Sequence, residues 1–178
     1  MRASYIRSGG IIMKVLIGHA SINEKGLVSG GRTGDQTKKE ICIREWYNKP
    51  WDVLLICTDK KLAKRAAAIM EKICKNDRYG YDWNNRATGY ISILKHGIAK
   101  GKGSFDCSSL VSACYKLAGL DINPYCTTRT LCKALLATGK FKSFRMHKYT
   151  SNPVYARRGA IYLAEGRHVV MALNNGGK

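Results

Sequence analysis

Residues Phe105–Val111 read FDCSSLV and open a segment with helical periodicity. Asp106 is a residue type that commonly caps helix N-termini. The apolar residues that share one face of this segment are Leu110, Val111, Cys114, Leu117 and Ala118. Gly119 follows them, in the position just past a helix end where glycine is common. The pattern predicts a helix whose first turn contains Cys107.

A cysteine in the first turn of a helix has an unusual chemical environment. The unpaired backbone N–H groups and the positive end of the helix dipole stabilise a thiolate, so the thiol pKa is lowered. The same N–H groups can bind the oxyanion of a tetrahedral intermediate. Cys107 is therefore a candidate nucleophile, with the alternative that it is only a small apolar residue of the core.

His168 is the candidate base. It opens the apolar strand pattern of residues 168–173, HVVMAL, directly after a tight turn at 165–167. A base held on a rigid strand can face a helix N-terminus across a groove. Two other histidines are weaker candidates, because His96 closes a predicted helix and His147 lies in a basic stretch.

The rest of the chain completes an α+β pattern. Strands are expected at residues 15–17, 51–57, 159–163 and 168–173, helices at 38–47, 60–75, 86–95, 106–118 and 127–139, and loops at 18–21 and 26–34. Asp59 is the expected N-cap of the helix at 60–75, and Gly97 is expected to end the helix that begins at Arg86. Helices first and strands last favour helices packed on a small antiparallel sheet.

The charge balance is the main departure from an average composition. The chain has 178 residues, and its 31 Lys and Arg against 12 Asp and Glu give a formal net charge of +19. Its length and its 45% hydrophobic content indicate one folded domain. No acidic residue occurs from Ile122 to Leu163. Nucleic acid, anionic lipid and an anionic cell wall are candidate partners, and a merely solvated surface is the alternative.

The seven cysteines are dispersed and include no C-x-x-C pair. No clustered histidines accompany them, so no metal site is predicted. An odd, scattered set is typical of reduced thiols, which favours synthesis in a reducing compartment. No apolar run approaches the length of a membrane span, and residues 1–10 lack the apolar stretch of a signal peptide. We expect a native start at Met13, with 1–12 as a non-native or disordered extension and 13–178 as a single domain.

Four motifs, in this order and spacing, resemble the NlpC/P60 cysteine peptidase family. They are FDCSSLV at 105–111, Ala118-Gly119, RGAIY at 158–162 and HVVMALNNG at 168–176. The N-terminal part, from Gly18 to Tyr47, is similar to endolysin catalytic domains encoded by phages and prophages of Gram-positive bacteria. Together the two resemblances cover most of the chain.

The resemblance implies a papain-like fold and a cofactor-free enzyme that hydrolyses an amide in the stem peptide or cross-link of peptidoglycan. It makes Cys107 the nucleophile and His168 its base. Tyr81 resembles the family's tyrosine near the nucleophile, which helps to bind the oxyanion. Asp106 and Ser108 flank the cysteine and are expected in the oxyanion and substrate-binding region.

Two departures from the family pattern carry structural expectations. The family usually has Gly-Asp where this chain has Gly159-Ala160, which is expected to loosen a turn. The family's third polar residue, which orients the histidine, lies on the strand after the histidine strand, yet the sequence ends at Lys178. Either the native chain continues into that strand or into a wall-binding domain, or another residue replaces the third one.

Three residues are candidates for this third position. Asn174 lies on the same strand face as His168 by the alternation of strand side chains, although Asn-Asn-Gly is also a common turn. His19 and Asp35 are substitutes from the N-terminal loops. The sequence leaves the choice among them open.

Two other functions are compatible with the sequence. A CHAP-like N-acetylmuramoyl-L-alanine amidase would use the same cysteine and histidine. A non-catalytic cationic binder of wall polymer or nucleic acid would need neither, and Trp46, Trp51 and Trp83 would be its stacking residues, although core packing is expected for at least two of them. The favoured interpretation is a monomeric hydrolase, made in the bacterial cytoplasm, that acts on peptidoglycan and anionic wall polymers after release, with no specific nucleic-acid partner.

Overall fold

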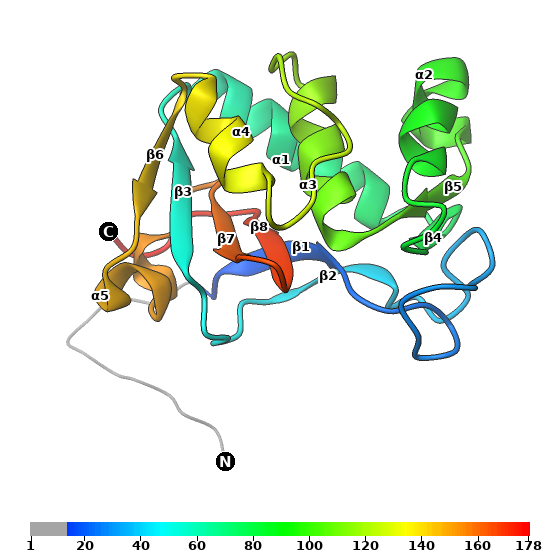
Figure 1. The fold of residues 1–178 in the computed structure, drawn as a ribbon, viewed down its shortest axis with the longest axis horizontal. Helices are drawn as coiled ribbons and strands as arrows, with labels where there is room; N and C mark the ends of the chain where they lie inside the picture. Colours follow the sequence, from blue (N-terminus) through cyan, green and yellow to red (C-terminus); the bar gives the residue numbers. More distant parts are fainter. Residues whose placement is uncertain (1–13) are drawn as a thin grey trace.

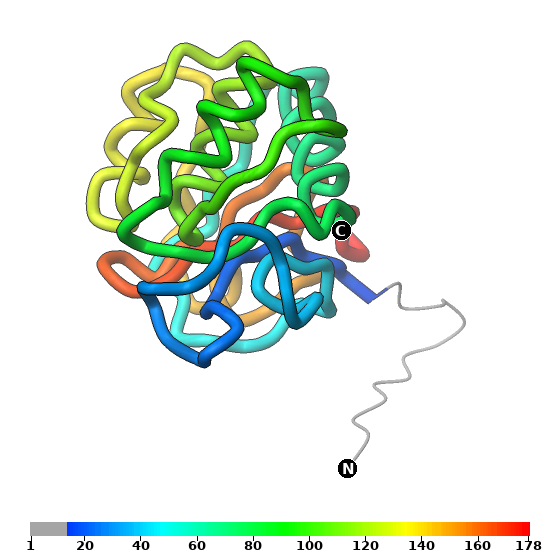
Figure 2. Tube along the Cα trace, turned by 90° about the vertical axis from the view of Figure 1, so that its right-hand side faces the viewer, coloured from blue at the N-terminus to red at the C-terminus, as the bar shows by residue number. Residues whose placement is uncertain are grey.

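The computed structural model describes residues 14–178. The expectations of an extension at 1–12 and of a native start at Met13 concern residues outside this range. Figure 1 shows helices stacked on one side of a twisted sheet, and Figure 2 shows the same layers from the side. The predicted α+β class is therefore confirmed.

The main sheet has six antiparallel strands in the order β2-β1-β8-β7-β3-β6. Its strands are β1 Leu16–Ala20, β2 Ile41–Glu45, β3 Val53–Cys57, β6 Phe141–Phe144, β7 Ile161–Ala164 and β8 His168–Ala172. A small parallel pair is formed by β4 Tyr79–Tyr81 and β5 Gly103–Phe105. The strand order places β1, near the start of the described chain, directly beside β8, near its end.

The helices of the described chain lie between the strands in sequence and cover mainly one face of the sheet. They are α1 Lys60–Cys74, α2 Thr88–Lys100, α3 Cys107–Leu117, α4 Leu131–Ala137, the short α5 His147–Thr150 and a 3₁₀ turn Pro153–Tyr155. Apolar residues of α1 and α3 pack together against the sheet in the larger of two buried clusters. Burial of this apolar surface is the main favourable contribution to folding.

Strand β8 is buried on both faces. Val169 and Met171 belong to the larger cluster under the helices, whereas Val170 and Ala172 belong to a smaller cluster on the opposite face. The smaller cluster is rich in aromatic residues and includes Trp51. Successive side chains of β8 therefore alternate between the two cores.

The predicted capped helices are confirmed. Asp59 precedes α1, and its carboxylate accepts the Leu62 N–H at 3.0 Å. Asp106 precedes α3 and accepts the Ser109 N–H at 2.7 Å. The Ser109 hydroxyl in turn accepts the Asp106 N–H at 3.0 Å, which completes a reciprocal cap. Cys107 is thus the first residue of α3.

Several predicted boundaries are wrong. Residues 41–45, expected in a helix, form β2, because their ladder with β1 outweighs the local preference. The expected loop at 18–21 is mostly strand, since β1 continues to Ala20. The helix after Arg86 continues to Lys100 across a kink at Gly97, which has φ 73°. The helix expected from 127 begins at Leu131, and β6 was not anticipated.

The turn at Gly159-Ala160, which was expected to be loosened, is held by hydrogen bonds. The Gly159 N–H donates to the Ala172 carbonyl at 2.8 Å, and the Tyr115 hydroxyl donates to the Gly159 carbonyl at 2.6 Å. Ala160 is 1% exposed, so an aspartate at that position would be buried. The apolar residue is compatible with a tight turn here.

Gly159→Ala is expected to destabilise the fold more than Gly139→Ala. Both glycines have positive φ, 88° and 69°, so each substitution costs about 1–2 kcal/mol of backbone strain. A methyl at Gly159 would also lie 2.7 Å from the Ala63 carbonyl of α1, whereas Gly139 has open space. The contact should add about 1–3 kcal/mol. Equal losses in urea unfolding free energy would contradict this packing.

Candidate functional site

Cys107 lies at the head of α3 with its side chain largely buried, at 8% exposure. Two backbone N–H groups interact with its sulfur, those of Ser108 in the same helix and of Val169 in β8. The second contact brings the head of α3 to the start of β8, where His168 is the first residue. The residues predicted as nucleophile and base thus come from neighbouring points of the fold.

The His168 imidazole is held between aromatic rings. It stacks on Trp51, with ring centroids 6.1 Å apart and an interplanar angle of 26°. The Trp51 indole N–H donates to the Tyr47 carbonyl at 3.2 Å, which fixes the indole. One face of the imidazole is therefore covered by the segment that leads into β3.

His19 in β1 meets His168 edge-on. His19 Nδ1 lies 3.5 Å from His168 Nε2, and the ring planes are nearly perpendicular, at 84°. This contact engages Nε2 of His168 and leaves Nδ1 without a hydrogen-bond partner among the described residues. Within residues 14–178, no hydrogen bond joins Cys107 directly to His168.

Burial governs the protonation of these three groups. It raises the pKa of the Cys107 thiol to about 12, with a further rise from the Asp106 charge, against the opposing N–H groups of Val169 and Ser108. Burial also lowers the pKa of His168 to about 3, assisted by His19 and by the charges of Lys49 and Arg44. The pKa of His19 falls to about 4, again chiefly through burial.

The resting site therefore holds a neutral thiol and two neutral imidazoles. The expectation that the helix N-terminus lowers the pKa of the Cys107 thiol is therefore wrong, because this pKa is raised. Partial charges on N–H groups do not offset the loss of hydration that a buried thiolate would suffer.

A family model described as endolysin-like domain matches residues 17–178. The chain belongs to the endolysin-like domain family. No curated protein and no solved structure matches it. Membership indicates a peptidoglycan-hydrolysing enzyme with a lytic role at the cell wall. In the part of this endolysin-like domain that the structure describes, no helix combines the length and apolar character needed to cross a bilayer.

The other residues predicted around the nucleophile lie close to it. Tyr81 is buried in β4, and its phenol pKa is raised by burial and then by the nearby Cys107 and Asp106 charges. The Ser108 hydroxyl donates to the Asp106 carboxylate at 3.1 Å. Asp106 and Ser108 thus stabilise the start of α3 through their side chains, which are not free to bind a substrate.

Asn174 and Asp35 lie elsewhere in the endolysin-like domain. The Asn174 amide accepts the Leu16 N–H at 2.7 Å and donates to the Lys14 carbonyl at 2.8 Å, so it fastens the start of β1. Asp35 accepts backbone N–H groups of the loop that leads into β2, including that of Thr37 at 3.1 Å. Neither side chain contacts His168 by a hydrogen bond among the described residues.

The tryptophans divide between the core and the surface. Trp51 is buried against His168, and Trp46 packs edge-on against Tyr162 with centroids 5.6 Å apart. Trp83 is 57% exposed, and its backbone N–H donates to the Val28 carbonyl of the glycine-rich loop. Core packing, expected for at least two of the three, is found for Trp46 and Trp51.

Sequence reasoning did not single out three further residues of this region. Tyr47 packs edge-on against His19, with centroids 6.2 Å apart, and the Arg44 guanidinium lies 4.7 Å above the Tyr47 ring. Arg86 pairs with Asp106 at the head of α3. Arg44 and Tyr47 lie in the N-terminal stretch that resembles endolysins, but no local pattern gives them a role, and they become neighbours of His19 through the β1–β2 pairing.

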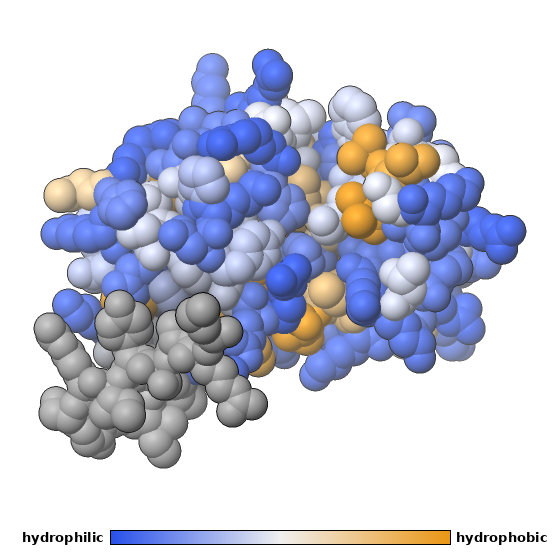
Figure 3. All heavy atoms as spheres, turned by 90° about the horizontal axis from the view of Figure 1, so that it is seen from below, coloured by the Kyte–Doolittle hydropathy of each residue, from blue (hydrophilic) through white to orange (hydrophobic). Residues whose placement is uncertain are grey.

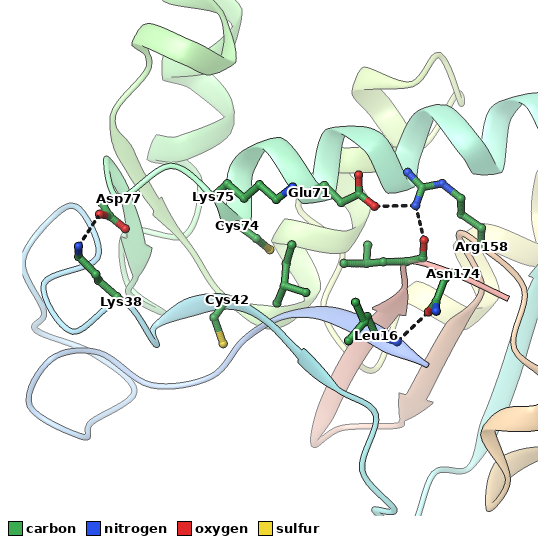
Figure 4. Close-up of a pocket in the computed structure, with 11 residues that line it drawn as sticks. Leu16, Lys38, Cys42, Glu71, Cys74, Lys75, Asp77, Arg158 and Asn174 are labelled. Carbon is green, nitrogen blue, oxygen red and sulfur yellow. Dashed lines mark hydrogen bonds and ion pairs between the residues drawn. The ribbon is translucent and has the colours of Figure 1, made fainter. Parts of the chain in front are cut away.

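A hollow of about 720 Å³ lies away from the candidate site, between α1 and the β1–β2 edge of the sheet. Figure 4 shows Arg158 at its rim, bonded to Glu71, and Asn174 beside Leu16. Neither Cys107 nor His168 lines it. The hollow and the cysteine–histidine site are therefore separate features of the endolysin-like domain.

Acidification is expected to destabilise the protein through its two coupled histidines. In the unfolded chain both histidines are protonated below their ordinary pKa of 6.5. In the folded protein the pKa of His19 is about 4 and that of His168 about 3, so these side chains are protonated only at lower pH. Their contribution is therefore full above pH 6.5 and is lost as the pH falls, by up to about 1.4 kcal/mol per pH unit for each imidazole.

His19→Gln should flatten the dependence of the unfolding free energy on pH between 6.5 and 4, as measured by urea unfolding. His96→Gln on α2 is the control, because His96 is exposed. A His19→Gln curve parallel to the wild-type curve would contradict the buried neutral imidazole.

Proposed function

We propose that this endolysin-like domain is an NlpC/P60-type cysteine peptidase with a papain-like arrangement that hydrolyses an amide bond in the stem peptide or cross-link of peptidoglycan. The observation that carries the proposal is that α3 packs against β8 with the Cys107 sulfur beside the Val169 N–H, one residue from the His168 that pairs with His19. A nucleophile, a base and an orienting group are what acyl transfer requires.

The reaction begins from the neutral state. As the Cys107 sulfur attacks the substrate carbonyl carbon, His168 accepts the thiol proton at Nδ1. The oxyanion of the tetrahedral intermediate is bound by N–H groups at the head of α3, with help from the Tyr81 hydroxyl. His168 then gives its proton to the leaving amine, and a thioester forms. Water, deprotonated by His168, hydrolyses the thioester and restores the thiol.

His19 is the orienting residue in this scheme. With Nδ1 of His168 as the proton acceptor, Nε2 carries the hydrogen and donates it to His19 Nδ1 at 3.5 Å. The family's third residue is expected on the strand after the histidine strand. In this fold β1 occupies the place beside β8, so an N-terminal strand supplies that residue. Asn174 and Asp35 are less suitable because backbone groups already occupy their side chains.

The charge of the chain favours an anionic polymer as the environment of the substrate. The formal net charge is +19, and the face shown in Figure 3 is predominantly hydrophilic with a few apolar patches. Several cations are exposed, among them Arg44 next to the histidine pair. Peptidoglycan and anionic wall polymers are the proposed partners, reached after release from a cytoplasm in which the monomer is made.

Cys107→Ala is expected to abolish release of fragments from purified peptidoglycan while folding and wall binding persist, because no other group of the site can form the thioester. Cys132→Ala is the matched control, since Cys132 is also a buried helical cysteine but lies in α4. Mass spectrometry of the fragments measures activity and identifies the bond. New amino termini within the stem support a peptidase, whereas release of intact stem peptide identifies a CHAP-like amidase. Release of fragments by Cys107→Ala at the wild-type rate would exclude Cys107 as the nucleophile, whereas wall binding with no fragments from the wild type would leave a cationic binder.

His19→Ala is expected to lower kcat by roughly 100-fold with little change in KM, because a poorly oriented base acts on the chemical step. His19→Asn should recover part of this loss, since its amide can still accept the His168 proton donor. Asn174→Ala is the control and should keep kcat within about twofold, because its contacts lie at Leu16 and Lys14. A larger kcat loss for Asn174→Ala than for His19→Ala would reverse the assignment.

A further inference from the structure

The Arg86 side chain joins three segments around the nucleophile. Arg86 lies in the turn before α2, and its Nε is 2.9 Å from Asp106 Oδ2. Its Nη2 donates to the Ser108 hydroxyl at 3.2 Å and to the Cys126 carbonyl. One guanidinium therefore contacts the residues on both sides of Cys107 and ties them to the segment between α3 and α4.

This contact is buried and charged. The Arg86 side chain is 17% exposed and the Asp106 side chain 7%. Asp106 Oδ1 is occupied by the Ser109 N–H and the Ser108 hydroxyl, which leaves Oδ2 for Arg86. Among residues 14–178, Arg86 is the ion-pair partner of Asp106. Loss of the guanidinium would leave a buried carboxylate without a counter-charge, which is strongly unfavourable.

The contact at Nε is ionic rather than an aligned hydrogen bond. Among the described residues the Arg86 Nε–H has no acceptor with hydrogen-bond geometry, although the Asp106 carboxylate oxygen is close. The two hydrogen bonds of Nη2 fix the guanidinium plane instead. A lysine ammonium would keep the charge but could not reproduce this planar arrangement.

We propose that Arg86 is a positioning residue for Cys107, holding the first turn of α3 in place and offsetting the Asp106 charge beside the sulfur. The inference rests on the proposed nucleophilic role of Cys107. The two neighbouring charges act on the thiol in opposite directions, since Asp106 raises the pKa of Cys107 and Arg86 lowers it. Substrate need not contact Arg86, because the side chain is mostly buried.

Arg86→Gln is expected to lower kcat by about 100-fold while KM changes less than about twofold, because the nucleophile is displaced without loss of a binding contact. Arg86→Lys should lose about tenfold in kcat, because it keeps the charge without the planar contacts. Arg65→Gln is the matched control. Arg65 binds the Ala118 carbonyl at the other end of α3, at 3.0 Å, and its loss should leave kcat unchanged.

A second readout separates this role from a general loss of stability. Alkylation of Cys107 by iodoacetamide is followed at pH 8 by mass spectrometry of the tryptic peptide 103–116, whose other thiol, Cys114, is fully buried. If the thiol pKa rises by about one unit, alkylation in Arg86→Gln slows about threefold, because the greater nucleophilicity of the thiolate partly compensates its lower population. Arg86→Gln/Asp106→Asn removes the uncompensated charge and should restore the alkylation rate.

These experiments test the role of Cys107 and the role of Arg86 separately. Hydrolysis by Cys107→Ala at the wild-type rate would overturn the proposed function, whatever Arg86 does. If Cys107→Ala is inactive but Arg86→Gln matches Arg65→Gln in kcat and in alkylation, only the role of Arg86 is overturned. An alkylation rate in the double variant that stays as low as in Arg86→Gln would also overturn it. Should Arg86→Gln fail to fold, Arg86→Lys and the double variant provide the same comparison.

Discussion

The antiparallel pairing of β1 with β8 is the contact on which the site depends. Its register is short, Ile17 with Ala172 and Gly18 with Met171, yet it inserts an N-terminal strand beside the C-terminal one. Gly18 makes room for α1 over β1, because a Cβ there would clash with the Met70 side chain. The next residue is His19, and the same pairing that completes the sheet brings its ring to His168.

The balance between burial and the helix N-terminus decides how the site can react. Cys107 has the position that usually favours a thiolate, but its sulfur is buried beside the Asp106 carboxylate, and burial outweighs the N–H groups. A preformed ion pair with His168 is therefore not the resting state. In the proposed mechanism a proton moves during attack, which makes the alignment of thiol and imidazole more important than a low thiol pKa. On that mechanism, the loss of a group proposed to position the reactants, such as His19 or Arg86, slows the chemical step.

Local patterns were sufficient for the elements whose signals are local. The caps at Asp59 and Asp106 and the turn before His168 are read within a few residues, and the corresponding helices and hairpin are present. The helix predicted at 38–47 was wrong because residues 41–45 form a strand that is stabilised by pairing with β1, and no local pattern reveals this partner. The choice among candidates for the proposed third position stayed open in the sequence for the same reason. His19 and His168 are 149 residues apart, and their contact follows from the strand order.

The two faces of β8 separate the core that contains Cys107 from the core beside His168. Cys107 belongs to the core under the helices, with Val169, whereas Val170, two residues from His168, lies in the opposite core with Trp51. By alternation the imidazole starts on the face away from α3. In the proposed mechanism the thiol and the imidazole approach each other around the first residues of β8, beyond the end of the β1 ladder at Gly18. This geometry accounts for a backbone group, the Val169 N–H, facing the sulfur. A shift of one residue in the β8 register would move the imidazole to the helix side and separate it from both His19 and Trp51.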